Sequence, residues 1–501
     1  MPTLGSSKSN VLAVKKETTA GTLIDPTAGT DYVTLQPDAT LNPSFDSLEN
    51  EEIRASIGRA KPIQGIERPE ASFSHYLKHS GVEGQAPEIG DLLESAFGTT
   101  SENATERLTA AAGTVSLLKL AAGGGDFSRG KAVLVKNATG YEIRPILSVA
   151  GNDLTPAFNF SNAPGTGVGA GKCINYTPAN AGHPSLSLHM YRGNGQAYEA
   201  LAGGKVTEFG FSAAAGQLIN ANFSVTGTKY FFNPIRVTAT TKHLDFLDNA
   251  TTRVITLTEK VYRSPYELAQ AIQDAMNALG SANTFTCTFS STTGKFTLTS
   301  SHATFELLWN TGANTATSVA TKIGFTTAAD SDSAQTYTSD NAQTYAAPHT
   351  PSYDNSDPLA AKGQECLMGA ASDNVNFEAA SIDFTLSNDR AEVPSVCAES
   401  GVNSIITTGR SVTLSVTALL DKHDADKFRR FADNQETGFC FNFGVKSGGN
   451  WVAGKCGSLY IPSAVISSFQ LEDLDTIIGI SIELTGFVDS NGNGEVYLNF
   501  L

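Results

Sequence analysis

Few residues of this sequence have the spacing that a catalytic or ligand-binding site requires. The segment 125–131, GDFSRGK, has the G-x-x-x-x-G-K spacing of a loop that cradles phosphate groups. Ala132, however, stands where such a loop carries the Ser or Thr that holds Mg²⁺. The next residues, AVLVK, are typical of a strand, so no helix N-terminus would meet a phosphate. We therefore predict an ordinary β-turn here and no nucleotide cofactor.

Two histidines, His75 and His79, are four residues apart, which is a metal-ligand spacing on a helix. Their surroundings alternate as a strand does, which puts both on one face but too far apart to share one ion. We interpret them as satisfied histidines of a core or an interface. No G-x-S-x-G or H-E-x-x-H motif is present. We therefore predict no catalytic residue, no cofactor and no metal site, and a protein that is not an enzyme.

The cysteines do not form a recognisable site either. They are scattered, with no C-x-x-C pair, and no signal-peptide run or membrane-spanning stretch is found. We therefore expect a chain that folds in a cytoplasm, where cysteines are most simply buried or idle thiols. The six positions are Cys173, Cys287, Cys366, Cys397, Cys440 and Cys456.

Acidic side chains gather in two short clusters, SLENEE at 47–52 and LEDLD at 471–475. Each cluster has two interpretations: a solvated loop, or part of a channel wall that repels DNA phosphates. The whole chain of 501 residues has a formal net charge of −16, and no basic stretch interrupts it. This balance argues against a protein that grips nucleic acid, because such binding depends on Lys and Arg. It does not exclude a surface past which DNA slides.

The elements that would position these residues occur in one order twice. In the last quarter, 376–487, a strand with Ile382, Phe384 and Leu386 on one side precedes a long polar loop. The strictly alternating strand SVTLSVTALL follows, and then a helix with Asp421 as N-cap and Asp424 in its first turn. Phe428 and Phe431 lie on one side of that helix, and further alternating strands close the unit.

Near the start of the chain, the same succession begins with DYVTLQPDATLNPSF and a polar loop. The strand ASFSHYLKH and a short helix, PEIGDLLESAFG, follow, with Pro87 at the start of the helix and Gly98 just past its end. GKVTEFGFSAA and GQLINANFSVTG are the closing strands. We interpret the chain as one unit duplicated, detected by pattern rather than by identity.

The segments within and after the first copy predict a mainly β (α+β) chain with two insertions. Short β runs separated by Gly, Asn and Pro indicate a small barrel-like insertion, and the second insertion has a helix with Ser264 as N-cap, Pro265 and a capping-box Glu267. The apolar tail could add as an edge strand to its own or a neighbouring subunit. The predicted domains are 1–98 with 184–235 (first β-sandwich), 99–183 (β-barrel-like insertion), 236–325 (α+β decoration domain), 326–358 (low-complexity linker) and 359–501 (second β-sandwich with a C-terminal arm).

Several stretches together resemble the major tail tube proteins of long, non-contractile-tailed bacteriophages. They are VLAVKKETTAGT near the start, ENEEIRASIGRAKPIQGIERPEASFSHYLK followed by PEIGDLLESAFG, the closing pattern G-Q-L-x-x-A-x-F-S-V-x-G, and LYIPSAVISSFQLEDLDTIIGISIELTGF near the end. The resemblance covers 1–98, 184–232 and 359–488, and its specificity comes from the ordered set. The α+β insertion looks like a module appended to phage virion proteins.

The resemblance implies a structural virion protein, assembled in the host cytoplasm, whose β-sandwiches form stacked rings around an acidic channel. Genomic DNA and a tape-measure protein would occupy that channel, and tail terminator and tail-tip proteins would bind its ends. Relatives with one tube unit form six-membered rings, so a duplicated unit would close a homotrimeric ring with pseudo-sixfold symmetry. A homohexamer is the alternative. The alternative function is a host-binding or decoration protein of the tail tip or surface, with the insertions touching the host; a polysaccharide-degrading enzyme lacks the required carboxylate period.

Overall fold

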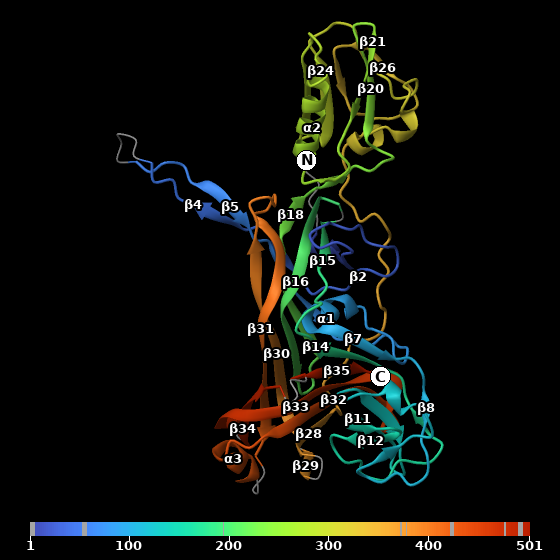
Figure 1. The fold of residues 1–501 in the computed structure, drawn as a ribbon, viewed down its shortest axis with the longest axis vertical. Coiled ribbons are helices and arrows are strands. Elements are labelled where there is room, and N and C mark those ends of the chain that lie inside the picture. The colour runs from blue at the N-terminus through green and yellow to red at the C-terminus, as the bar shows by residue number, and fades with distance from the viewer. Residues whose placement is uncertain are drawn as a thin grey trace. The chain divides into compact units, whose positions relative to one another are not determined.

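A computed structural model describes residues 6–52, 58–193, 195–370, 373–376, 378–420, 425–474, 477–488 and 494–501 (Figure 1). The chain is mainly β, as the alternating patterns predicted. It forms two compact units, which we describe separately. One comprises Met1–Val11, His189–Leu201 and Tyr230–His349, and the other comprises Leu12–Leu188, Ala202–Lys229 and Thr350–Leu501.

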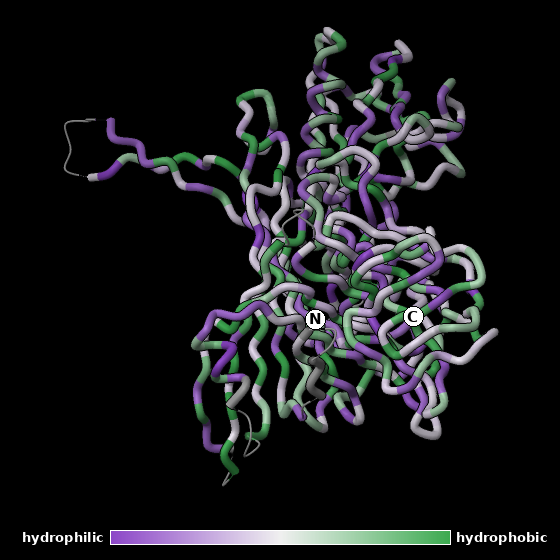
Figure 2. Tube along the Cα trace, turned by 60° about the horizontal axis from the view of Figure 1, so that its bottom comes forward, coloured by the Kyte–Doolittle hydropathy of each residue, from purple (hydrophilic) through white to green (hydrophobic). Residues whose placement is uncertain are grey.

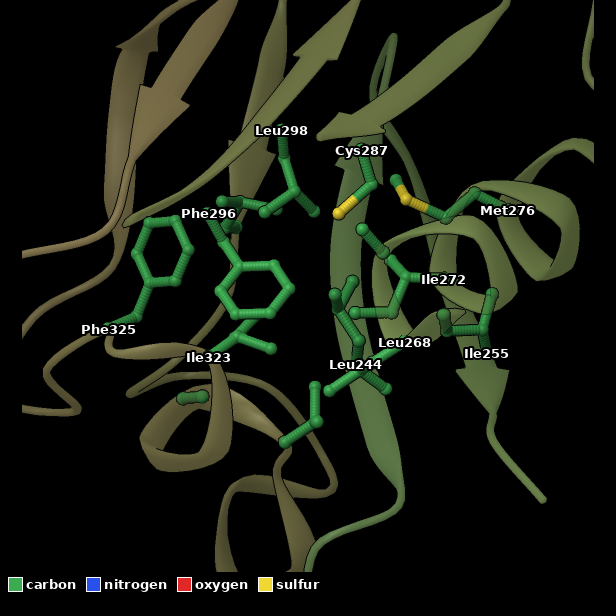
Figure 3. Close-up of a cluster of buried hydrophobic side chains, with 14 of the residues drawn as sticks. Leu244, Ile255, Leu268, Ile272, Met276, Cys287, Phe296, Leu298, Ile323 and Phe325 are labelled. Atoms are coloured by element: carbon green, nitrogen blue, oxygen red, sulfur yellow. The ribbon is translucent and has the colours of Figure 1, made fainter. Parts of the chain in front are cut away.

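The smaller unit packs a helix, α2, and three sheets around one apolar core. Its sheets have the orders β21-β20-β25-β26, β23-β24-β27 and β19-β22. In Figure 3, Leu268, Ile272 and Met276 of the helix lie in the same cluster as Leu244 and Cys287 of the strands. The elements are β19 (Ile235–Arg236), β20 (His243–Asp248), β21 (Thr251–Thr256), β22 (Val261–Tyr262), α2 (Pro265–Asn277), β23 (Phe285–Ser290), β24 (Lys295–Ser300), β25 (Phe305–Leu307), β26 (Ser331–Ala334) and β27 (Thr336–Thr338).

Helix α2 begins as its sequence predicted. The Ser264 hydroxyl accepts a hydrogen bond from the backbone N–H of Glu267, and Pro265 occupies the first turn, where its missing N–H costs nothing. The Glu267 carboxylate accepts from the N–H of Arg263, one residue before the N-cap, rather than from the cap itself. The start of the helix is therefore fixed by side chains as well as by packing.

The prediction that 326–358 is a linker is wrong for its first part. Strands β26 and β27 lie there and pair with β25 and β24. Tyr337 is buried, and its hydroxyl donates to the carbonyl of Phe305 over 2.6 Å. Because these strands are rich in Ser, Thr and Asp, their apolar content gave no sign that they complete the sheets of this unit.

In the larger unit, the insertion after the first helix forms a small β-barrel. Its six strands follow the order β8-β13-β10-β11-β12-β9, and an antiparallel bridge between Thr109 and Leu120 closes the sheet next to its two end strands. Val133, Ile146 and Leu154 lie in its core. The strands are β8 (Arg107–Leu108), β9 (Leu118–Lys119), β10 (Ala132–Lys136), β11 (Tyr141–Ala150), β12 (Asp153–Pro156) and β13 (Gly169–Ala170).

The remaining elements fall into two sets, which we call the first copy and the second copy after the two stretches that the sequence pattern matches. In the first copy, α1 ends at Gly98, which adopts the left-handed conformation at φ 96° as a C-cap. The first copy contains β1 (Val11–Lys16), β2 (Tyr32–Val33), β3 (Thr40–Asn42), β4 (Phe45–Leu48), β5 (Ile63–Glu67), β6 (Glu70–Tyr76), α1 (Gly90–Phe97), β7 (Gly98–Asn103), β14 (Cys173–Pro178), β15 (Leu186–Arg192), β16 (Ala197–Ala214), β17 (Asn220–Thr226) and β18 (Lys229–Phe232).

The second copy has longer strands and a short helix, α3. Phe428 and Phe431 of the helix lie 5.7 and 6.4 Å from the ring of Phe469. The predicted caps Asp421 and Asp424 lie outside the described residues. Its elements are β28 (Glu365–Ala370), β29 (Asp373–Asn376), β30 (Ala379–Pro394), β31 (Val402–Leu419), α3 (Ala425–Ala432), β32 (Thr437–Ser447), β33 (Asn450–Leu474) and β34 (Ile477–Gly486).

The C-terminal strand, β35 (Tyr497–Phe500), is an interior strand of its own chain and not an edge strand. It pairs with β14 on one side and with β33 on the other. The amide of Asn499 donates to the carbonyl of Gly130, and its oxygen accepts from Asn175 and from the N–H of Ala132. The tail therefore joins the barrel and the first copy to the second copy.

Candidate assembly surface and channel wall

Both copies arrange four strands in the same order. In the first copy, β3 pairs with β6, β6 with β17 and β17 with β16. In the second copy, β30 pairs with β31, β31 with β34 and β34 with β33. All six pairings are antiparallel. The two sheets therefore share one strand topology.

The two sheets also match residue by residue. The fourth strand of each has a β-bulge, between Val206 and Glu208 in one and between Ile466 and Ser468 in the other. On the far side of the bulges, each row of paired residues across the first sheet has a counterpart row across the second sheet. They run Thr40, Ser72, Ser224, Glu208 in the first copy and Asp383, Ser415, Glu483, Ser468 in the second.

The two sheets are continuous, because the last strand of the first pairs with the first strand of the second. Strand β16 pairs antiparallel with β30 from Glu208 opposite Ser387 to Ala214 opposite Ser381. The result is a single run of strands in the order β3-β6-β17-β16-β30-β31-β34-β33. It begins at β3 and ends at the part of β33 beyond Ala464. Nothing in the sequence pattern indicated this junction.

One face of this run of strands is apolar and buried. Aromatic rings follow one another across it: Phe73 lies 5.7 Å from Phe223, Phe209 lies 5.3 Å from Phe223, and Phe209 lies 6.1 Å from Phe384. Phe211 continues the row toward the second copy, where it contacts aromatic rings of β32. Burial of this face fixes the register, since a slip of one residue would expose every ring.

The opposite face is polar and open. It is made of small hydroxyl and amide side chains with carboxylates at intervals, and the segments named below contain no Lys or Arg. Lys205, which pairs with Thr226, lies just before the β16 segment. These segments are 40–42, 70–76, 220–226, 208–214, 381–387, 411–417, 481–485 and 465–472. The carboxylates on the open face are Glu70, Glu208, Asp383, Glu472 and Glu483.

Within these segments, the charged groups of the open face are carboxylates. Partial burial raises the pKa of Asp383 above its ordinary value. Of the two acidic clusters, only LEDLD contributes, through Glu472 in β33; SLENEE lies on the hairpin β4–β5 and Asp475 lies outside the described residues. The other carboxylates are single residues in alternating strands, so the sequence alone did not identify them as a group.

The hairpin formed by β4 and β5 extends beyond the sheet (Figure 1). Its strands continue β3 and β6, as the outer halves of β30 and β31 extend their own sheet. Figure 2 shows hydrophilic and hydrophobic stretches along both of its strands. Phe45, Leu48 and Ile63 are exposed on it. A long arm with exposed apolar side chains is suited to contact another molecule.

The phosphate-loop spacing at 125–131 has no phosphate-loop geometry. Lys131 is buried and its ammonium donates to the carbonyl of Asp126 over 2.9 Å, and Ala132 begins strand β10 rather than a helix. The segment forms a turn, as the sequence predicted, in which the N–H of Lys131 donates to the carbonyl of Ser128.

The two histidines are buried and have different surroundings. His75 lies in β6, and its Nε2 is 2.7 Å from Glu88 and 3.0 Å from Thr34. His79 follows the strand, and burial lowers its pKa, with the charge of Lys455 acting in the same direction. No group of three metal-ligating side chains occurs in the described part of the chain.

All six cysteines are unpaired, and all except Cys397 are buried. Burial raises the pKa of each buried thiol to about 12, so none of the five is a reactive thiolate at neutral pH.

Comparison with known proteins identifies a family for part of the chain. The family model of phage tail tube proteins matches residues 7–254, about half of the chain. Comparison with curated proteins gives no match. The SPP1 tail tube structure, from solid-state NMR and cryo-EM, aligns at 16% identity over 28% of this chain and 77% of that chain, with a TM-score of 0.19. Among the described residues, no helix is both long and apolar enough to cross a membrane. Over residues 7–254 the chain belongs to the family of phage tail tube proteins, and it is a structural component of the virion tail.

Proposed function

We propose that three copies of this chain close one ring of the tail tube, and that the open polar face of the eight-strand run lines its channel. The internal junction between β16 and β30 supports this arrangement, because it shows how the last strand of one unit binds the first strand of the next. At the two ends of the eight-strand run, β33 holds the position in its sheet that β16 holds in the other. Likewise, β3 holds the position that β30 holds. A heterologous contact of this kind forms a ring when its rotation closes.

The internal junction also predicts the register between chains. Within the chain, Gly210, Phe211 and Ser212 lie opposite Thr385, Phe384 and Asp383. The corresponding row in the next junction pairs Gln470 with Asn42, Leu471 with Leu41 and Glu472 with Thr40. Leu471 is 63% exposed in the single chain, whereas its counterpart Phe211 is buried. Pairing with a neighbouring chain would remove Leu471 from water in the same way.

The charge of the open face supports its position along the channel. Duplex DNA binds proteins mainly through cations that neutralise its phosphates and release counterions. A wall whose charged groups are mainly carboxylates offers little such gain, so DNA would pass without dwelling. A tape-measure protein before ejection, and terminator and tip proteins at the ends, are the partners that such a tube requires.

Cysteine cross-linking tests the ring. In a chain with Cys397→Ser, the pair Asn42→Cys and Gln470→Cys should form disulfides between neighbours, because opposed residues on paired strands have Cβ atoms close enough to bridge. We expect a non-reducing gel to show a ladder that ends at three chains, and electron microscopy to show hollow rods. A ladder that continues to six chains would establish the hexamer, and chains that stay single would refute the junction.

Charge reversal tests the channel wall. Changing Glu208, Asp383 and Glu483 to Lys should leave ring assembly intact but make the tubes retain DNA, with a binding constant that falls as salt rises. Co-sedimentation of tubes with a short duplex measures this. Glu106→Lys, on the exposed surface of the barrel insertion, is the matched control and should retain none. Equal retention by both variants would contradict the assignment of the wall.

A further inference from the structure

The two copies differ at one end of their sheets. In the first copy, the N–H of Leu77 donates to the carbonyl of Ile219 over 2.8 Å, and both side chains are 0% exposed. In the second copy, the N–H of Leu420 donates to the carbonyl of Ile478 over 3.2 Å. These positions correspond in the matched registers, yet Leu420 is 36% exposed and Ile478 is 55% exposed.

A segment of the chain covers the end of the first copy. The N–H of Ile219 donates to the carbonyl of Leu359 over 2.8 Å, and the N–H of Leu359 donates to the carbonyl of Leu77 over 2.9 Å. The bond from the N–H of Ala361 to the carbonyl of Gln217 continues this ladder. Leu359 is only 2% exposed, so its side chain fills the end of the apolar core.

Among the described residues, the corresponding end of the second copy is uncovered. It consists of Leu420, Leu471 and Ile478, which we call the open end. All three are exposed, and no described residue covers them as Leu359 covers the first copy. A group of exposed aliphatic side chains at the mouth of a core marks a contact surface. The first copy shows the form of the missing part: an extended segment with a buried leucine.

We propose that the N-terminal segment of a second copy of this chain, residues 1–5, covers the open end, with Leu4 in the place of Leu359. The covering segment of the first copy leads directly into β28, the first strand of the following unit. In the ring proposed above, on which this inference rests, the following unit at the open end is the first copy of the next chain. The segment that leads into that unit is its N-terminus, before β1.

The sequences of the two segments agree with this substitution. Leu359 precedes Glu365, the start of β28, by six positions, and Leu4 precedes Val11, the start of β1, by seven. Both segments, MPTLGSSKSN and DPLAAKGQE, contain Pro, Leu and Lys in that order among small residues. Small residues allow a segment to lie close against the end of a sheet, and one leucine supplies the apolar side chain.

A second cross-linking pair tests this contact. On the Cys397→Ser background, Leu4→Cys with Ile478→Cys should give a covalent ladder ending at three chains. Leu359→Cys with Ile219→Cys is the matched control within one chain, since Leu218 and Ala360 form an antiparallel bridge beside it. The disulfide within one chain of this control should make the denatured protein migrate faster on a non-reducing gel, with no band at the mass of two or three chains.

The outcomes separate this contact from the ring itself. If the pair at 42 and 470 forms the ladder but the pair at 4 and 478 leaves single chains, the ring stands and the N-terminal contact is refuted. A link between 4 and 478 inside one chain also refutes it, because the occupant would then be the chain's own N-terminus. If neither pair joins chains, the ring and the contact both fail.

A polar substitution gives a readout that does not depend on cross-linking. Ile478 is exposed in the single chain, so Ile478→Ser should leave the thermal stability of unassembled protein unchanged. Losing the burial of one isoleucine at each contact should weaken ring assembly by roughly tenfold, measured as the concentration at which rings form. Leu108→Ser, which alters an exposed leucine of the barrel, should not change that concentration. Equal assembly by both variants would overturn the proposal.

Discussion

At the scale of single residues, Glu88 joins three distant parts of the larger unit. One carboxylate oxygen accepts from the N–H and hydroxyl of Thr34 and lies 2.7 Å from Nε2 of His75, and the other accepts from the N–H of Asp354. Burial alone would raise the pKa of Glu88, but the hydrogen bonds from His75 and Thr34 outweigh it and lower the pKa to about 2. The ionised form is therefore the one that the fold stabilises.

This pKa predicts a pH-dependent effect of Glu88→Gln. A carboxylate whose pKa is depressed by folding contributes stability above its unfolded value near 4.5, and that contribution is lost as pH falls toward 2. We expect the substitution to lower the free energy of unfolding by about 1–3 kcal/mol at pH 7, and by progressively less below pH 4.5. Urea unfolding at pH 7, 5 and 4 measures the trend. Glu106→Gln is the control, and a loss that stays constant with pH would contradict this assignment.

At the scale of elements, the N-cap of α2 is an isolated contribution that can be measured. Ser264→Ala removes the hydroxyl that accepts from Glu267, and should destabilise the smaller unit by about 1 kcal/mol. Ser264→Asp should restore the cap, because a carboxylate also suits the positive end of a helix. Thermal unfolding of the three proteins checks both expectations. If the Ala and Asp variants were equally destabilised, the hydroxyl bond would not be the cause.

The C-terminal strand gives a second prediction at this scale. Deleting the last five residues, 497–501, removes β35 from between β14 and β33 and exposes both strand edges. We expect the truncated chain to be insoluble or rapidly digested by protease, because unpaired interior strands aggregate. Deleting 1–5 should leave the unassembled chain soluble. A truncated chain that resists protease as well as the full chain does would show that β35 is dispensable.

Elements were predictable from the sequence where a local pattern defines them. The alternating pattern predicted that Phe73, Phe223 and Phe384 lie on buried faces. The capping pattern of Ser264 and Glu267 predicted the start of α2. Strands β26 and β27 were missed because they are polar and are stabilised by tertiary packing around Tyr337. The junction of β16 with β30 was missed because pairing between strands far apart in the chain depends on tertiary contacts. The carboxylates of the open face could be grouped only once those registers were known.

At the scale of the whole molecule, the segment after the smaller unit limits how that unit can be removed. Thr350–Leu501 belongs to the larger unit, and Asp354 and Leu359 bond to Lys78, Glu88 and Ile219. We predict that replacing 236–348 by a flexible linker leaves tube formation intact, whereas extending the deletion to 361 abolishes it. Electron microscopy of both proteins distinguishes them. Loss of tubes in the shorter deletion would show that the α+β unit is part of the stacking contacts rather than a decoration.

In the ring proposed above, fusion of two sheets in one polypeptide would change what a single gene can encode around the channel. When every position in a ring comes from identical copies, each substitution recurs at all of them and each must tolerate it. Here the halves can diverge independently: one carries the barrel and the α+β unit, while the other keeps long uninterrupted strands. Bulky additions would therefore appear at alternate positions around the circumference, which leaves room between them that a uniform ring could not provide.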